Sequence, residues 1–229
     1  MRLTRARQTI LLLLPTARAI GWSPPMWAAI LAILYVLKEA PKAFIDYRIL
    51  VLRVGSLLLC MGAAFVLDDP TEETIGHVPT PLLLRRSLRI ALLLPLIAGV
   101  WGVLVRLAGE VPRRAGGPMP IGDLTLEAAT LLLIALSAAC LGAHLTSDRL
   151  GGIAAAPIVL AFVGAAMFLP YDYKLIVGSA SDPRWAEAHD MWRFAFGGAA
   201  LAFLYLNRSP GGYRAMSRLR ALRTAPRAV

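Results

Sequence analysis

The chain has 229 residues, of which 58% are hydrophobic and only 17% are charged, and its mean hydropathy is +0.64. A soluble domain carries about 25% charged and 45–50% apolar residues, so this composition excludes an ordinary soluble domain and indicates an integral membrane protein. The formal charge of +10 does not indicate nucleic acid as a partner, because the arginines lie at the ends of apolar segments, where positive charge orients a membrane protein.

The N-terminal segment 1–22 resembles a signal peptide in its first residues, but Pro15 follows only five consecutive apolar residues. Because a signal peptide needs an apolar run of about 7–15 residues, we expect the segment to be retained. Apolar residues recur at helical spacing beside the N-terminal arginines, namely Leu3, Ala6, Ile10 and Leu14. This pattern predicts an amphipathic helix on the cytoplasmic leaflet, ended by Pro15.

A membrane-spanning helix needs about 20 mostly apolar residues. Five segments fit this requirement: 49–67, 87–107, 124–145, 151–169 and 191–206. A sixth segment, 24–40, is shorter, and Lys38 near its end can extend to the interface. A re-entrant or interfacial helix is the alternative for segment 24–40. We therefore predict an all-α integral membrane protein with one domain, a bundle of six transmembrane helices.

The distribution of basic residues predicts the orientation of the bundle. The tail 207–229 contains six arginines, Arg208, Arg214, Arg218, Arg220, Arg223 and Arg227. Because positive flanking residues stay in the cytoplasm, both termini are expected there. The preference for Arg over Lys and the abundance of Ala, Leu and Gly are typical of a GC-rich bacterial genome, so we expect a multi-pass protein of the bacterial plasma membrane.

Small residues at spacings of four predict close helix packing within lipid. They are Ala135, Ala139 and Ala143, then Ala138 with Gly142, and Gly198 with Ala202. Such faces indicate a compact bundle, and they are also typical of a dimer interface.

An acidic stretch connects the second and third predicted spans. In Asp69-Pro70-Thr71-Glu72 the aspartate is an N-cap residue, the proline fits the first helical position and the glutamate fits the third. Gly76 can end this helix, so we predict a short, acidic cytoplasmic helix. One interpretation is a well-capped connecting loop. Another is a metal or catalytic site with Glu73 and His77, although the stretch contains no second histidine or carboxylate pair at ligand spacing.

A third interpretation comes from a resemblance. Six spans, an N-terminal amphipathic helix, a short cytoplasmic helix between spans two and three, and a longer outer loop before the last span resemble the six-helix ABC exporter permeases of the drug, O-antigen and teichoic-acid kind. The stretch "FVLDDPTEETIGHVPTPLLLRR" is also similar to actinobacterial membrane proteins of that kind.

The resemblance implies partners and roles. It implies that the acidic helix couples the chain to a separate ATPase subunit, through Asp68, Asp69, Thr71, Glu72, Glu73 and His77. It also implies a dimer with an identical or different second permease, ATP and Mg bound by the ATPase rather than by this chain, and a pair of re-entrant helices in residues 171–192.

Other polar residues receive structural interpretations. His144, with Ser147 and Asp148 nearby, reads as an interfacial histidine without partners at triad spacing. In the group Trp185, Glu187, His189, Asp190 and Trp192, aromatic anchoring at the interface is favoured over a metal or substrate site. The arginines that lie in or near spans, Arg53, Arg106 and Arg193, are expected to extend to the interface.

The sequence contains no Walker motif, glycine-rich phosphate loop or Cys/His cluster, so we expect no enzyme activity, cofactor or metal on this chain. Cys60 and Cys140 lie in apolar runs and are expected to be small buried residues. The predicted function is the permease subunit of an ABC exporter with a hydrophobic substrate. The alternative is a non-transporting scaffold or an accessory subunit of a membrane complex. An intramembrane enzyme would need a convergent polar site, which the sequence does not show.

Overall fold

The computed structural model describes residues 13–40, 44–68, 82–109, 119–145, 151–170 and 173–208. Its six long helices are α2 (Ser23–Glu39), α3 (Ile45–Ala64), α4 (Leu82–Gly109), α5 (Ile121–Leu145), α6 (Gly151–Phe168) and α7 (Trp185–Arg208). A short helix, Leu13–Ala19, precedes them, and the 3₁₀ turn η2 (Phe65–Leu67) follows α3. These residues contain no strand, so the all-α prediction is confirmed.

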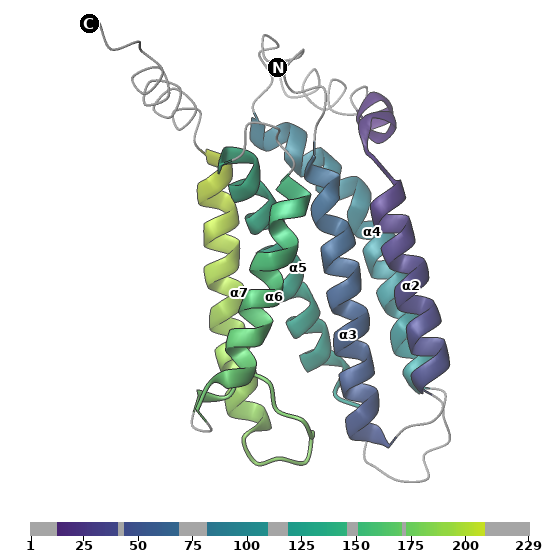
Figure 1. The fold of residues 1–229 in the computed structure, drawn as a ribbon, viewed down its shortest axis with the longest axis vertical. Coiled ribbons are helices and arrows are strands. Elements are labelled where there is room, and N and C mark those ends of the chain that lie inside the picture. Colours follow the sequence, from purple (N-terminus) through teal and green to yellow (C-terminus); the bar gives the residue numbers. More distant parts are fainter. Residues whose placement is uncertain are drawn as a thin grey trace, which may run out of the picture.

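The six long helices form one bundle in which successive helices run in opposite directions (Figure 1). The short helix Leu13–Ala19, η2 and Arg208 therefore lie at the same end, which we name the termini end. Residues 173–184 lie at the opposite end, named here the loop end. Helices α3 and α5 form the centre: α3 packs against α2, α4, α5 and α6, and α5 also packs against α6 and α7.

The helix α4 lies at one side of the bundle. It packs on α2 and α3, whereas little direct packing joins it to α5. This leaves a gap in the packing between α4 and α5, with α3 behind it.

Among the described residues, four helical stretches are long and apolar enough to cross a membrane: Ile45–Leu67, Arg86–Gly109, Ile121–Ala143 and Gly151–Phe168. The pair Leu13–Ala19 and Ser23–Glu39, bent by 72°, makes a fifth if it forms one broken span. Helix α7 is not among the four; it carries polar residues at both ends, among them Asp190 and Arg193 near its start and Asn207 and Arg208 at its end. The structure thus indicates a membrane-embedded protein, while six spans remain a prediction.

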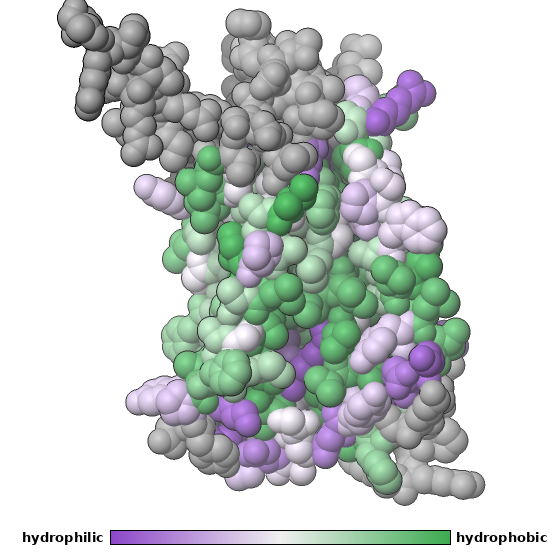
Figure 2. Space-filling model, in the orientation of Figure 1, coloured by the Kyte–Doolittle hydropathy of each residue, from purple (hydrophilic) through white to green (hydrophobic). Residues whose placement is uncertain are grey.

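The outer surface of the bundle is apolar. A hydrophobic band covers the middle of the face shown in Figure 2, and hydrophilic residues gather mostly toward the ends. On α2 the exposed side chains include Trp27 and Leu34, and on α7 they include Phe194, Leu201 and Tyr205. Large exposed apolar surfaces are unusual for a soluble monomer, and in a bilayer they would contact acyl chains.

One local prediction is wrong. Pro15 does not end the first helix but lies inside the helix Leu13–Ala19. The bend comes later, where the indole of Trp22 donates to the carbonyl oxygen of Ala17 at 2.7 Å. The residues before position 13, which carry most of the predicted amphipathic pattern, lie outside the part of the chain that the structure describes.

The small residues do bring helices together. A Cβ atom on Gly151 would lie 2.2 Å from the carbonyl oxygen of Ala139, and one on Gly142 would lie 2.6 Å from the Cβ of Ala154. The predicted close packing is therefore confirmed between α5 and α6. By contrast, a Cβ on Gly198 would have no neighbour within 4 Å, so the dimer interface stays a prediction.

The orientation can be tested with single cysteines. Ser181 is exposed at the loop end, and Ser217 follows the last helix, which ends at the termini end. If the termini end faces the cytoplasm, an impermeant thiol reagent applied to intact cells should label Ser181→Cys and leave Ser217→Cys unlabelled. The native cysteines, Cys60 and Cys140, are buried and provide a low background. Labelling of Ser217→Cys in intact cells would refute the predicted orientation.

Candidate functional site: a buried charged cluster beside an apolar groove

A carboxylate lies inside the bundle near the loop end. Glu127 belongs to α5, within the apolar stretch Ile121–Ala143, and its side chain is only 3% exposed. An ionised side chain at such a position is expensive unless other groups bind it. The structure must therefore supply partners, and it does so from two other helices.

The first partner is Arg53 of α3. Its Nε donates to Oε2 of Glu127 and its Nη2 donates to Oε1, both at 2.6 Å. The third nitrogen, Nη1, donates to the carbonyl oxygen of Val177, also at 2.6 Å. Such a two-point contact is the strong form of the arginine–carboxylate pair. The expectation that Arg53 extends to the interface is therefore wrong, because its side chain points inward and is 12% exposed.

The second partner is His189 of α7, whose side chain is 2% exposed. Its Nε2 lies 3.0 Å from Oε1 of Glu127, and its Nδ1 lies 2.7 Å from the carbonyl oxygen of Trp185, one turn earlier. Both ring nitrogens are therefore within hydrogen-bonding distance of oxygen atoms.

Two tryptophans close around this cluster. The Trp185 ring packs on His189 with centroids 4.4 Å apart and lies under the guanidinium of Arg53 at 5.6 Å. Its indole nitrogen donates to Oδ2 of Asp123 at 2.7 Å. The indole of Trp192 donates to the carbonyl oxygen of Leu175 at 2.9 Å.

The structure thus divides the group predicted as interfacial anchors. Trp185 and Trp192 are 8% and 2% exposed, so they are core residues, and only Glu187 and Asp190 point outward. The structure also brings together a convergent group of polar side chains that the sequence does not show, since Arg53, Glu127 and His189 meet. No group of three potential metal ligands occurs among the residues that the structure describes.

The cluster also fixes the segment before α7. Residues 173–184 are turns and irregular backbone, bound to the bundle through Arg53 at Val177 and through Trp192 at Leu175. Within this range the chain forms no re-entrant helix pair of the kind that the resemblance implies. The polar cluster therefore joins α3, α5, α7 and this segment at the loop end.

Of the predicted coupling residues only Asp68 is described, and it follows η2 at the termini end. Its Oδ1 accepts a hydrogen bond from the backbone N–H of Gly152 at 2.7 Å, and its carbonyl oxygen accepts one from Arg89 at 3.1 Å. Burial raises the pKa of the Asp68 carboxyl, although the N–H groups of Gly152 and Gly151 oppose the shift. Asp68 thus caps the start of α6.

The other predicted coupling residues, Asp69, Thr71, Glu72, Glu73 and His77, lie outside the described ranges. The coupling helix accordingly stays a prediction. The same holds for the interfacial role of His144, whose side chain is not described, and of its neighbours Ser147 and Asp148.

A second buried contact joins helices at the termini end. Arg86 of α4 is 5% exposed, and its Nη1 donates to Oδ1 of Asn207 at 3.1 Å. The amide nitrogen of Asn207 donates to the carbonyl oxygen of Phe203 at 2.7 Å, and its Oδ1 lies 3.9 Å from the sulfur of Cys140. These contacts connect α4, α5 and α7.

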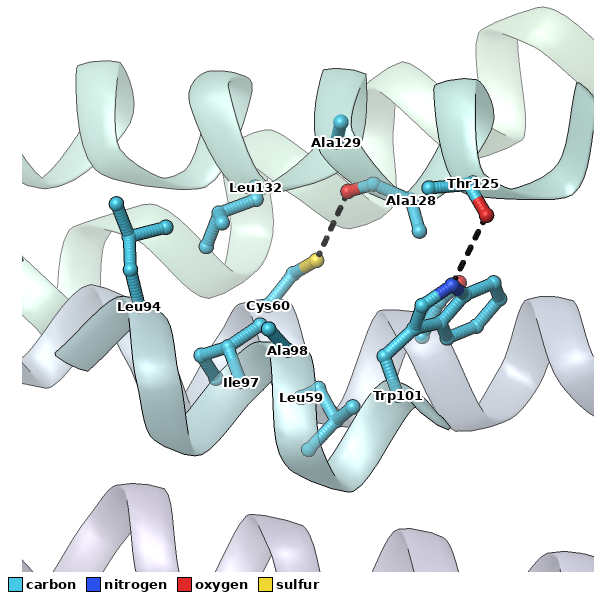
Figure 3. A pocket seen from close by; sticks show the side chains of 11 residues that line it. Leu59, Cys60, Leu94, Ile97, Ala98, Trp101, Thr125, Ala128, Ala129 and Leu132 are labelled. Atoms are coloured by element: carbon cyan, nitrogen blue, oxygen red, sulfur yellow. Dashed lines mark hydrogen bonds between the residues drawn. The ribbon is translucent and has the colours of Figure 1, made fainter. Parts of the chain in front are cut away.

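An apolar groove of about 280 Å³ lies between α4 and α5 with α3 as its floor (Figure 3). Its lining consists of Ser56, Leu59, Cys60, Leu94, Ile97, Ala98, Trp101, Thr125, Ala128, Ala129 and Leu132. The indole of Trp101 donates to Oγ1 of Thr125 at 3.0 Å and bridges the two walls, as Figure 3 shows.

The polar groups of this lining already have partners. The hydroxyl of Ser56 donates to the carbonyl oxygen of Arg53 at 2.8 Å, and that of Thr125 donates to the carbonyl oxygen of Ile121 at 2.7 Å. The thiol of Cys60 points to the carbonyl oxygen of Ala128 at 3.6 Å. The groove therefore offers a hydrocarbon surface rather than a set of free hydrogen-bonding groups.

Comparisons with protein-family models, with curated proteins and with solved structures find no match. The site must consequently be interpreted from its own chemistry. Glu127 did not appear among the residues singled out in the sequence, although a lone carboxylate within a predicted span, 124–145, is a signal for a buried polar partner.

Replacement of the Glu127 carboxylate should destabilise the folded protein strongly. Glu127→Gln keeps the shape of the side chain but leaves the Arg53 guanidinium buried without its counter-charge, and breaking a buried pair in this way costs about 3–5 kcal/mol. The matched control is Glu187→Gln, because Glu187 pairs with Arg184 at 3.4 Å but is 71% exposed, and exposed pairs contribute about 0–1 kcal/mol. Thermal unfolding in detergent should show a much lower unfolding temperature for Glu127→Gln and a nearly unchanged one for Glu187→Gln. Equal unfolding temperatures would contradict a structural role for the Arg53–Glu127 pair.

Proposed function

We propose that this chain is a membrane-spanning permease subunit of an ATP-driven ABC exporter that handles a hydrophobic substrate. The observation that carries the proposal is the apolar groove between α4 and α5. A closed apolar cavity of about 150 Å³ already binds benzene, and this groove has about 280 Å³. It is therefore large enough for part of a lipid-like molecule.

The position of the groove supports entry from the bilayer. Leu94 at its edge is 47% exposed, and Ala98 beside it is exposed as well. Little packing closes the space between α4 and α5. A hydrophobic molecule dissolved in the membrane would reach the groove without leaving the apolar phase, and its transfer would then not require dehydration of polar groups.

The ATPase part of the proposal rests on the sequence and on the arrangement of the helices. The chain has no Walker motif, so ATP hydrolysis is assigned to a separate subunit that binds ATP and Mg. The connection for which the sequence predicts the acidic helix follows η2, which lies at the termini end (Figure 1). In the proposal that end is cytoplasmic, where the ATPase subunit would bind.

The proposal also includes a second permease, identical or different. The exposed side of α7 offers a surface for it, since Gly198 and Ala202 are both exposed at the spacing that favours close helix contact in lipid. The protein would then be a multi-pass subunit of a bacterial plasma membrane complex with both termini in the cytoplasm.

A scaffold or accessory subunit is the second candidate. The hydrogen bonds of the cluster favour it, because every side-chain nitrogen of Arg53 and both oxygens of Glu127 have partners. A fully bonded network of this kind makes one side of the bundle rigid, which suits a protein that holds partners in place.

The groove can be tested with a photoreactive fatty acid. Diazirine-labelled palmitate in liposomes that contain the purified protein should crosslink to Leu94, Ile97 and Leu132, detected by mass spectrometry. Ala128→Phe fills the groove and should reduce these crosslinks severalfold. Ala165→Phe, on an exposed position of α6, is the matched control and should leave them unchanged. Crosslinks spread evenly over all exposed helices, with no effect of Ala128→Phe, would show that the groove does not bind acyl chains.

Coupling to an ATPase can be tested through the acidic helix. If Glu72 and Glu73 contact a basic groove on the ATPase, the double variant Glu72→Lys, Glu73→Lys places like charges together and should release that subunit. The variant protein should still insert and fold, since exposed substitutions change stability by about 0.5 kcal/mol or less. Glu187→Lys, exposed at the loop end, is the control.

The measurement is ATP hydrolysis that copurifies with the chain from its native membrane. Hydrolysis that copurifies with the wild type and with Glu187→Lys but not with the double variant supports the exporter. If other proteins copurify with the wild-type chain but no ATP hydrolysis does, the exporter proposal is overturned and the scaffold is favoured.

A further inference from the structure

The two ring nitrogens of His189 have different partners. Nδ1 faces the carbonyl oxygen of Trp185 at 2.7 Å. A carbonyl oxygen can only accept, so Nδ1 carries a hydrogen. Nε2 faces Oε1 of Glu127 at 3.0 Å. If this nitrogen had no hydrogen, its lone pair would point at a carboxylate oxygen, and the two atoms would repel.

A proton must therefore lie between Nε2 and Oε1. It belongs to the histidine, because both oxygens of Glu127 already accept hydrogen bonds from the Arg53 guanidinium, and such a pair favours the ionised carboxylate. The geometry describes an imidazolium that donates from both nitrogens.

The surrounding charges lead to the same conclusion. Among the residues that the structure describes, the charged groups in contact with this site are Arg53 from α3 and Asp123 and Glu127 from α5. Segment 173–184 contributes the carbonyl oxygen of Val177, bound to Arg53. Two positive and two negative charges balance only when His189 is protonated; without the proton the four side chains sum to one negative charge inside the bundle.

The other charged residues around the start of α7 do not alter this balance. Arg184 pairs with Glu187, and Arg193 pairs with Asp190. Glu187 is 71% exposed, and Arg193 and Asp190 are 66% and 60% exposed, so solvent screens these pairs.

We infer that the Arg53–Glu127–His189 cluster is a proton-binding site, and that the bound proton attaches the first turns of α7 and segment 173–184 to α3 and α5. Loss of the proton at alkaline pH removes the hydrogen bond between His189 of α7 and Glu127 of α5 and loosens the attachment of the first turns of α7 at the loop end. The inference does not depend on the exporter proposal, since it rests on the hydrogen-bonding partners of His189.

The direction of the pH dependence follows. Burial lowers the pKa of His189, but the hydrogen bonds to Glu127 and to the Trp185 carbonyl, together with the negative charges of Glu127 and Asp123, raise it by more, so the net shift is upward from 6.5. His189 precedes the predicted span 191–206. A group with a raised pKa in the folded state contributes its full stability below about pH 6.5 and loses it as the pH rises through the higher value.

The protonation state can be measured directly. The sequence contains three histidines, His77, His144 and His189, so the double variant His77→Gln, His144→Gln retains only the one in the cluster. In ¹⁵N-histidine NMR spectra of this variant in nanodiscs, both ring nitrogens should be protonated at acidic pH, and the ring should lose its proton at a pH above about 6.5, the value of a free histidine. A ring that is already neutral, with one protonated nitrogen, below about pH 6.5 would overturn the inference.

The loosening of α7 at the loop end can be measured with two single-cysteine variants, one at a buried and one at an exposed position of α7. Ala188 is 1% exposed and Ala186 two positions earlier is exposed, so Ala186→Cys corrects for the pH dependence of thiol reactivity. The labelling rate of Ala188→Cys relative to Ala186→Cys should rise as the pH increases from 6 to 9.5, by about tenfold for each unit of upward pKa shift. In a His189→Gln background, which cannot titrate, the ratio should not change with pH. A wild-type ratio that is independent of pH would overturn the inference.

Discussion

The constraint on which this structure depends is the carboxylate of Glu127 within an apolar helix. An unpaired carboxylate there would oppose insertion and folding. Its two oxygens instead accept hydrogen bonds from Arg53 of α3, and Oε1 also lies within hydrogen-bonding distance of His189 of α7. Because these partners belong to different helices, satisfying one charge also determines how three helices meet at the loop end.

The position of the remaining helices follows from weaker interactions. Between α5 and α6 the absence of side chains at Gly142 and Gly151 allows close contact, which provides van der Waals attraction where the hydrophobic effect between helices is absent. Helix α4 packs on α2 and α3 but hardly on α5. The bridge from Trp101 to Thr125 spans that gap. The α4 side of the bundle is accordingly less constrained than the side that contains the cluster.

The sequence predicts the helices well and the cluster poorly, for physical reasons. Hydropathy over about 20 residues is a local property, so the predicted segments 24–40 and 151–169 nearly coincide with α2 and α6. The partners of Glu127 lie 74 and 62 positions away along the chain, and no local pattern identifies them. Arg53 and Trp185 were therefore assigned to the interface, which is the usual place for such residues near the end of a span. A lone glutamate in a span signals a buried partner without identifying it, and Glu127 is not among the residues for which the sequence predicts a role. The acidic helix remains a sequence prediction, because its residues from Asp69 on lie outside the described ranges.

The cluster and the groove are built on the same two helices. Ser56 in the groove donates to the carbonyl oxygen of Arg53, one turn earlier on α3, and Ala128 in the groove directly follows Glu127 on α5. Any change in the spacing of α3 and α5 must therefore alter the width of the groove and the length of the Arg53–Glu127 contacts together. A short charged contact loses energy steeply when it lengthens in an apolar surrounding, whereas the groove walls are joined mainly by weak apolar contacts. Motion in this protein should consequently occur at α4, which can move away from α5 without breaking the cluster, while α3 and α5 keep their spacing as long as His189 and Arg53 hold the carboxylate between them.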